Sequence, residues 1–290
     1  MTLTGVHVPL ITPFEPAGAV AHGVLEELAS EVVRAGAAGV VALGTTAEAG
    51  ALDAAERGAV LDVLNAVCRR QGVPLVAGAA TADQLRTLAG YPAVTAALCL
   101  VPPFVRPGED GVIAHFAALA AASPVPLVAY HVPQRTGQQL SAAAIRRLAA
   151  IDGIIGIKYA PESLDADAVE LLTDPPPGFA VLAGTDTLLA PMLALGAHGA
   201  VAASAHLATE EFVALAGAWR DGRAGHARSL GHRLARLSAA LFAEPNPTVI
   251  KGVLHAQGRI PSPAVRLPLL AAAEATVHTA MRTLSTLRTL

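Results

Sequence analysis

The chain has 290 residues, of which 53 % are hydrophobic and 15 % are charged, so it can form a large core and does not have the composition of a disordered protein. The net charge is −3 and no basic cluster is interleaved with aromatic residues, which argues against nucleic acid as a partner. No apolar run reaches roughly 18 residues and Met1–Gly5 lacks the basic start of a signal peptide, so we expect no membrane contact.

Short runs rich in valine, isoleucine, leucine and alanine alternate with longer segments of helical period along most of the chain. The helical segments include Asp53–Arg70, Asp110–Ala122, Ser141–Ala150 and Asp186–Leu195. The expected strands are Val6–Thr12, Gly39–Leu43, Pro74–Ala77, Thr95–Val101, Pro126–Tyr130, Ile154–Lys158, Phe179–Ala183 and Ala200–Ala203. Eight such units predict an α/β fold, a (β/α)8 TIM barrel, and a doubly wound open sheet is the structural alternative.

The strand signals stop near Thr209, and the rest of the chain has helical patterns. These cover Thr209–Arg220, Ala224–Phe242, Pro247–Gln257 and Pro263–Leu287. Glu244-Pro245-Asn246-Pro247 is a helix start signal, in which Asn246 can cap the helix and Pro247 suits its first turn. We therefore expect a barrel over residues 1–222 and a C-terminal helical appendage over residues 223–290.

The cysteines and histidines favour no metal site or organic cofactor. Cys68 and Cys99 have no CxxC spacing and are expected to be buried free thiols in a reducing cytoplasm. The ten histidines are dispersed without an HxxxH or HxH pair, which argues against a metal. No GxGxxG follows a strand, which argues against a dinucleotide cofactor.

Polar side chains gather where the expected strands end, which is the face of a TIM barrel that carries its active site. Hydroxyls, a phenol, a guanidinium and an amine are expected to converge there. They belong to the segments Gly44-Thr45-Thr46-Ala47-Glu48, Tyr130-His131-Val132-Pro133-Gln134-Arg135, Gly156-Ile157-Lys158-Tyr159 and Gly184-Thr185-Asp186.

Only two lysines occur beside 18 arginines, so each of them can have a role that arginine cannot fill. Lys158 ends an expected strand, where it faces either the barrel mouth or a salt bridge at the rim. In the mouth, apolar walls favour a neutral amine, which can attack a ketone and form an iminium ion. Lys251 lies inside an expected C-terminal helix, away from the strand ends, and is expected to be structural.

Other residues at the mouth have roles that suit the same chemistry. Tyr130 can relay protons, or it can make one structural hydrogen bond. Thr45 and Thr46 offer hydroxyls and backbone N–H groups to a carboxylate, although Thr-Thr turns are common. Arg135 can bind a second carboxylate, or it can be a surface arginine.

Taken together, these segments resemble the dihydrodipicolinate synthase / N-acetylneuraminate lyase family of class I aldolases. The resemblance covers essentially the whole chain. It rests on Ile11-Thr12-Pro13-Phe14, Gly44-Thr45-Thr46-Ala47-Glu48, Tyr130-His131-Val132-Pro133, Gly156-Ile157-Lys158, Gly184-Thr185-Asp186 and Glu244-Pro245-Asn246-Pro247.

The resemblance implies a role for each candidate residue. Lys158 would form the imine, Tyr130 would transfer protons, and Thr45 would join both the proton relay and the site for the substrate carboxylate. The remaining substrate-binding residues would be Thr46 at that carboxylate, Arg135 at a second carboxylate, and Gly184 and Val201 as walls near Lys158. The resemblance also implies a cytoplasmic homotetramer that binds a small 2-oxo acid without a metal or an organic cofactor.

Two segments depart from the synthase pattern. A Tyr-Tyr pair, of which the second tyrosine reaches a neighbouring subunit's proton relay, is replaced by Pro103 and Phe104, and a Gly-Thr-Gly is replaced by Gly78-Ala79-Ala80. Three functions therefore stay open: condensation of pyruvate with aspartate semialdehyde, favoured by Arg135; cleavage or dehydration of a sugar-derived 2-oxo acid, favoured by Phe104; and 2-oxo-acid binding without catalysis.

Overall fold

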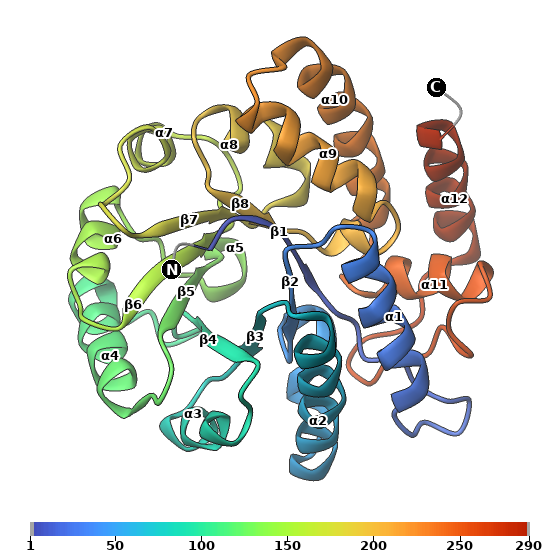
Figure 1. The fold of residues 1–290 in the computed structure, drawn as a ribbon, viewed down its shortest axis with the longest axis horizontal. Helices are drawn as coiled ribbons and strands as arrows, with labels where there is room; N and C mark the ends of the chain where they lie inside the picture. Colours follow the sequence, from blue (N-terminus) through green and yellow to red (C-terminus); the bar gives the residue numbers. More distant parts are fainter. Residues whose placement is uncertain (1–2, 289–290) are drawn as a thin grey trace.

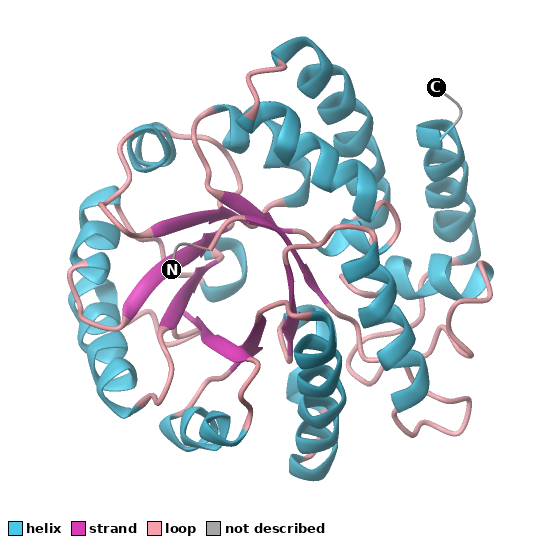
Figure 2. Ribbon diagram, in the orientation of Figure 1, coloured by secondary structure: helices cyan, strands magenta, loops and turns pink. Residues whose placement is uncertain are grey.

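The computed structural model describes residues 3–288, and its centre is a closed barrel of eight parallel strands (Figures 1 and 2). Each strand pairs with the next, and β8 pairs with β1. The strands are β1 (Gly5–Pro9), β2 (Gly39–Ala42), β3 (Leu75–Gly78), β4 (Val94–Leu100), β5 (Leu127–His131), β6 (Ile154–Tyr159), β7 (Ala180–Ala183) and β8 (Gly199–Val201). The predicted TIM barrel is confirmed, and each expected strand overlaps an observed one.

Helices surround the barrel, and several of them begin at a residue whose side chain caps the helix. The helices that follow the strands are α1 (His22–Arg34), α2 (Ala54–Gln71), α3 (Ala82–Thr87), α4 (Gly108–Ala122), α5 (Pro133–Thr136), α6 (Ala142–Ala149), α7 (Ala166–Thr173), α8 (Leu189–Ala194) and α9 (Thr209–Arg220). Asp53 and Glu56 form a capping box at the start of α2, while Ser141 and Asp165 cap α6 and α7. The expected helix from Asp186 begins only at Leu189, because Asp186–Leu188 form a 3₁₀ turn.

Three further helices follow the barrel: α10 (Ala224–Leu241), α11 (Thr248–Ala256) and α12 (Glu274–Arg288). In Figure 1, α10 lies against α9, while α11 and α12 lie on the side that carries α1. A salt bridge of 2.8 Å between Arg259 and Glu31 of α1 joins these parts.

Two expectations for the C-terminal region are wrong. The helix expected over Pro263–Leu287 begins only at Glu274, since prolines at 261, 263 and 268 interrupt the preceding segment. Asn246 does not cap α11: Pro247 occupies the N-cap position without a side-chain cap, and the Asn246 amide instead donates to Thr46.

The alternation of strand residues decides which side chains reach the barrel interior. On β5, Val128 and Tyr130 belong to the inner cluster of apolar residues, whereas Leu127 and Ala129 pack outward against the helices. On β6, Ile157 and Tyr159 pack outward, so Lys158 between them faces inward. The outer cluster continues into α10, α11 and α12. The division at residue 222 stays a prediction.

The structure also bears on the cysteines and on the question of a membrane span. Cys68 and Cys99 are buried and free, as expected, and burial raises the pKa of each thiol to about 12. Within residues 3–288, no helix combines the length and apolar character needed to span a membrane.

Candidate active site

A cavity of about 240 Å³ lies at the C-terminal ends of the strands and brings the candidate residues together. All seven residues singled out from the sequence line it: Thr45, Thr46, Tyr130, Arg135, Lys158, Gly184 and Val201. They come from loops or strand ends of β2, β5, β6, β7 and β8, so only closure of the barrel makes them neighbours. The structure thus supports the choice of residues, while their individual roles stay predictions.

Lys158 is buried beside Tyr130 in this cavity. The two residues face each other in the β5–β6 register, and the Lys158 Nζ lies 4.2 Å from the centre of the Tyr130 ring. Only 5 % of Lys158 is exposed, and it makes no salt bridge with another described residue. Among the described residues, Lys158 therefore does not form the salt bridge at the barrel rim that was the alternative expected from the sequence. Its amine lies against the face of the Tyr130 ring instead.

Gly184 provides the space for the Lys158 side chain. A Cβ atom at this position would lie 2.9 Å from Cγ and 3.0 Å from Cε of Lys158, and 3.0 Å from Cβ of Ala160. Contacts this short require the lysine or the strand to move. A side chain at residue 184 is thus incompatible with the observed path of the amine.

Asp186 is the one carboxylate among the residues that line the cavity. It is 6 % exposed and accepts a hydrogen bond of 2.6 Å from the backbone N–H of Ser204, which ties the end of β7 to the turn after β8. Burial raises the pKa of Asp186, while its hydrogen bonds and the charge of Lys158 oppose this shift. Asp186 is therefore a buried acid that lines the same cavity as the candidate amine of Lys158.

Thr45 and Thr46 lie in a 3₁₀ turn, Thr45–Ala47, that follows β2. Leu43 enters this turn with φ 53°, and a Cβ at Gly78 of β3 would lie 2.1 Å from its carbonyl oxygen. Only glycine at residue 78 allows the turn to pack so closely on β3. Thr46 is 2 % exposed, and its Oγ1 accepts a hydrogen bond of 2.9 Å from Nδ2 of Asn246.

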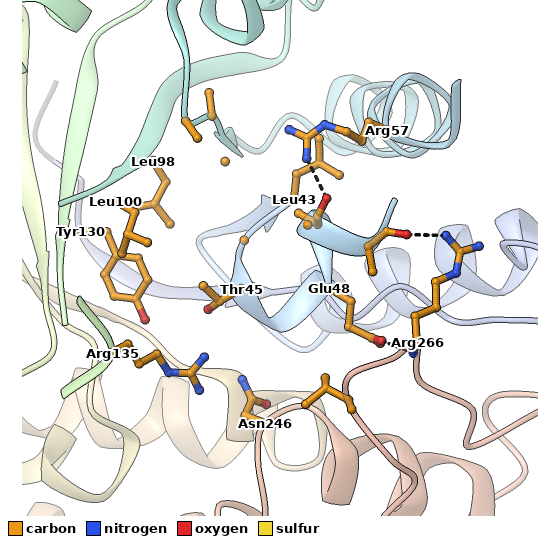
Figure 3. Close-up of a pocket in the computed structure, with 18 of the residues that line it drawn as sticks. Leu43, Thr45, Glu48, Arg57, Leu98, Leu100, Tyr130, Arg135, Asn246 and Arg266 are labelled. Carbon is orange, nitrogen blue, oxygen red and sulfur yellow. Dashed lines mark hydrogen bonds between the residues drawn. The ribbon is translucent and has the colours of Figure 1, made fainter. Parts of the chain in front are cut away.

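A second cavity, of about 940 Å³, adjoins the first (Figure 3). Four residues line both cavities: Thr45, Tyr130, Arg135 and Asn246. In Figure 3 the guanidinium of Arg135 lies between the hydroxyl of Tyr130 and the amide of Asn246. The wall beyond them is largely apolar and includes Leu43, Ala79, Ala80, Leu98 and Leu100. The arrangement suits a small acid in the inner cavity and a second reactant that enters through the outer one.

Lys251 has surroundings that differ from those of Lys158. It is fully buried in α11, where Nζ lies 2.5 Å from Oε1 of Glu48 and donates to the carbonyl of Ala264. Burial lowers the pKa of Lys251 to about 8, while Glu48 raises it. Lys251 lines neither cavity, and its contacts support the structural role expected from the sequence.

Phe104 lies outside both cavities of the single chain. It is 94 % exposed in the loop after β4, has φ 71°, and its N–H donates to the carbonyl of Thr136. The adjacent Val105 is 74 % exposed. That Phe104 reaches the site of a neighbouring subunit stays a prediction.

Two residues of the site were not predicted from the sequence. Asn246 was expected to cap a helix and Asp186 had no expected role, although both lie in segments that carry the family resemblance. For Asp186, the position directly after a strand was the available signal. Nothing in the local sequence indicates that Asn246 meets Thr46, which lies 200 positions away.

No group of three or more histidine, cysteine, aspartate or glutamate side chains that could hold a metal ion occurs in the part of the chain that the structure describes. The donor set of the inner cavity is one amine, one phenol, one guanidinium, one carboxylate and several hydroxyls and amides. This set suits an organic acid whose carbonyl group reacts with the amine.

Comparisons with known proteins agree with this geometry. The model of the dihydrodipicolinate synthetase family matches residues 2–287. A 4-hydroxy-tetrahydrodipicolinate synthase from Methanothrix thermoacetophila is 37 % identical over 272 residues, which cover 91 % of this chain and 90 % of that protein. A synthase of the same name from Neisseria meningitidis serogroup C is 34 % identical over 274 residues, which cover 92 % of this chain and 93 % of that protein.

The likeness extends to solved structures. The crystal structure of the chloride-inhibited dihydrodipicolinate synthase from Acinetobacter baumannii, complexed with pyruvate, has a TM-score of 0.93 to this chain at 29 % identity. The comparison covers 100 % of both chains. Barrel and C-terminal helices are therefore both part of the shared structure.

Proposed function

This chain belongs to the dihydrodipicolinate synthetase family, and we propose that it is a lyase that binds pyruvate or a related 2-oxo acid as an imine on Lys158. One observation carries the assignment of the lysine. The Lys158 amine is buried beside Tyr130, without a salt bridge among the described residues, in a cavity that also holds the hydroxyls of Thr45 and Thr46.

The proposed reaction begins when the neutral amine of Lys158 attacks the ketone carbon of the acid. Loss of water then leaves an iminium ion, and the adjacent methyl carbon loses a proton to give an enamine. The enamine carbon forms a bond to the carbonyl carbon of an aldehyde, whose oxygen takes up a proton and becomes a hydroxyl. Water then hydrolyses the iminium ion and frees Lys158. Cleavage of a hydroxylated 2-oxo acid runs through the same steps in reverse.

The other residues of the cavity supply what these steps need. Thr45 and Thr46 hold the carboxylate of the 2-oxo acid with hydroxyl and backbone donors. Tyr130, with Thr45, moves protons to and from the imine and enamine. Gly184 and Val201 leave room beside Lys158, and Arg135 at the junction of the two cavities binds a second carboxylate.

Two candidate reactions have separate support: condensation of pyruvate with aspartate semialdehyde, and cleavage or dehydration of a sugar-derived 2-oxo acid. Aspartate semialdehyde carries the carboxylate that Arg135 would bind, and the relatives named above are 4-hydroxy-tetrahydrodipicolinate synthases. A sugar-derived 2-oxo acid fits the replacement of a relay tyrosine by Phe104, since its own hydroxyl can complete the relay. Because the phenyl ring of Phe104 cannot carry a proton, we propose that this protein synthesises dihydrodipicolinate poorly and that another reaction of the family is its main activity.

The compartment, the oligomeric state and the absence of cofactors are proposed from the family resemblance. We propose a cytoplasmic homotetramer that uses no metal or organic cofactor, with the loop of Phe104 and Val105 at a contact between subunits. The exposure of both side chains in the single chain supports this contact, because large apolar side chains that protrude together favour a covered surface.

Exchange of the pyruvate methyl protons in D₂O tests the imine without knowledge of the second reactant. We expect the wild-type protein to catalyse this exchange, since the enamine forms reversibly, and Lys158→Arg to abolish it while circular dichroism stays unchanged. Arginine keeps the charge but is not a nucleophile at neutral pH. Exchange by Lys158→Arg within a few-fold of wild type would exclude the imine, and no exchange by the wild type would favour a protein that binds without catalysis.

A further inference from the structure

Asn246 joins the C-terminal helical region to the residue expected to bind the substrate carboxylate. It lies between α10 and α11, is 8 % exposed, and its Nδ2 donates to Oγ1 of Thr46 at 2.9 Å. It also lines both cavities, at the junction where Figure 3 shows its amide facing Arg135. The C-terminal region therefore contributes a side chain to the site.

The direction of this hydrogen bond has a chemical consequence. An amide N–H can only donate, so Thr46 must use a lone pair of its oxygen to accept. The hydroxyl proton of Thr46 then remains available, and no acceptor for it is found within the described part of the chain. A carboxylate has only acceptor atoms, so it is the complementary partner for that proton.

A second observation shows that this amide is not placed for stability alone. Oδ1 of Asn246 is buried and accepts no hydrogen bond from any described residue. A buried acceptor without a partner destabilises a fold, and such groups in native structures call for a functional reason. The single hydrogen bond to Thr46 is the interaction that the side chain provides.

We propose that Asn246 is a positioning residue, which holds the Thr46 hydroxyl with its proton directed at the carboxylate of the bound 2-oxo acid. This inference rests on the proposed function, because it takes Thr46 as the carboxylate site. The amide acts through Thr46, and its effect is therefore confined to ligands that carry a carboxylate.

The experiment measures half-saturation of borohydride trapping on Lys158 with pyruvate and with methyl pyruvate, whose ester has no carboxylate charge. We expect Asn246→Ala to raise half-saturating pyruvate about 5-fold. Asn246→Asp should raise it about 50-fold, because its oxygen accepts the Thr46 proton and its charge repels the substrate. Methyl pyruvate should stay within about twofold of wild type in both variants.

Asn65→Ala is the matched control. The Asn65 side chain also makes a hydrogen bond across the fold, accepting from the N–H of Ala93, and it lines neither cavity. Its loss should lower the unfolding temperature without changing half-saturation by pyruvate. Equal shifts for pyruvate and methyl pyruvate in Asn246→Ala would mean a merely structural role and would overturn the proposal, as would an unchanged value for pyruvate.

A double-mutant cycle keeps the test decisive if Asn246→Asp fails to fold. In a Thr46→Val background, Asn246→Ala should have no further effect on half-saturation by pyruvate, and an undiminished effect would overturn the proposal. Wild-type protein that forms no adduct at all would instead overturn the proposed function itself. The two failures are thus distinct.

Discussion

The two lysines show how position decides the chemistry of one residue type. Lys251 faces a buried carboxylate and is held as an ion pair, whereas Lys158 faces a tyrosine ring inside a cavity. Their rarity beside 18 arginines drew attention to both in the sequence, and the predicted positions, Lys158 near a strand end and Lys251 inside a helix, are confirmed. Long-range partners were not predictable: the contacts of Glu48 with Lys251 and of Thr46 with Asn246 form only once residues about 200 positions apart meet.

Gly184→Ala tests whether the observed path of Lys158 is needed for activity. The new Cβ would contact Cγ and Cε of Lys158, so we expect trapping by borohydride to slow by roughly 100-fold as the amine loses its alignment. Gly58→Ala is the control, because its Cβ meets nothing within 4 Å and lies within α2. Trapping that is equally fast in Gly184→Ala and in wild type would show that Lys158 reacts from another position.

At the scale of elements, the strands were predictable because both of their faces are covered, which makes each a nearly continuous apolar run. The C-terminal segment was not, since the apolar residues of 263–273 suggested a helix. That segment is instead held in an irregular path by Arg266, which bonds to Glu56, to the carbonyl of Ala51 and, through its backbone N–H, to Glu48. Hydrogen bonds to distant residues thus decide the backbone path of this segment, and the local apolar pattern does not.

The loop after β4 bears on which reaction the protein catalyses. Dihydrodipicolinate synthesis needs a proton relay in which, by the family resemblance, a tyrosine occupies the position of Phe104. Losing one acid–base group costs about 10²–10⁴-fold, so we expect the wild type to be a poor synthase and Phe104→Tyr to improve it. A coupled assay with pyruvate and aspartate semialdehyde measures both proteins.

Two outcomes of that assay would count against this view of the loop. Wild-type turnover comparable to that of an ordinary biosynthetic synthase would contradict the expected deficit. No gain in Phe104→Tyr would mean that residue 104 does not face a neighbouring active site. Leu270→Tyr is the control, since it adds a phenol at another exposed apolar residue that lines neither cavity, and it should leave turnover unchanged.

At the scale of the whole molecule, burial of three histidines makes stability depend on pH. Burial lowers the pKa of His7, His131 and His206 to about 4, from 6.5 in the unfolded chain. Between these values the unfolded state binds more protons, so stability is fully present above pH 6.5 and is lost as the pH falls toward 4. At about 1.4 kcal/mol per pKa unit, each histidine contributes up to about 3 kcal/mol.

Urea unfolding followed by the fluorescence of Trp219 measures this dependence. We expect the midpoint to fall steadily from pH 6.5 to pH 4.5 in wild type, and His131→Phe to show about two thirds of that fall, since one of three protonations is gone. His232→Gln, at an exposed position, should keep the wild-type slope. A midpoint that does not change with pH over this range would be incompatible with neutral buried histidines.

The residue to which pyruvate is attached after borohydride trapping decides whether Lys158 forms the imine. Intact mass followed by peptide mapping distinguishes the two lysines without any assumption about the second reactant. We expect one reduced adduct per chain, on Lys158, with Lys251 unmodified because its amine is paired with Glu48 and the residue lines neither cavity. An adduct on Lys251, or none with any of a panel of 2-oxo acids, would contradict this expectation.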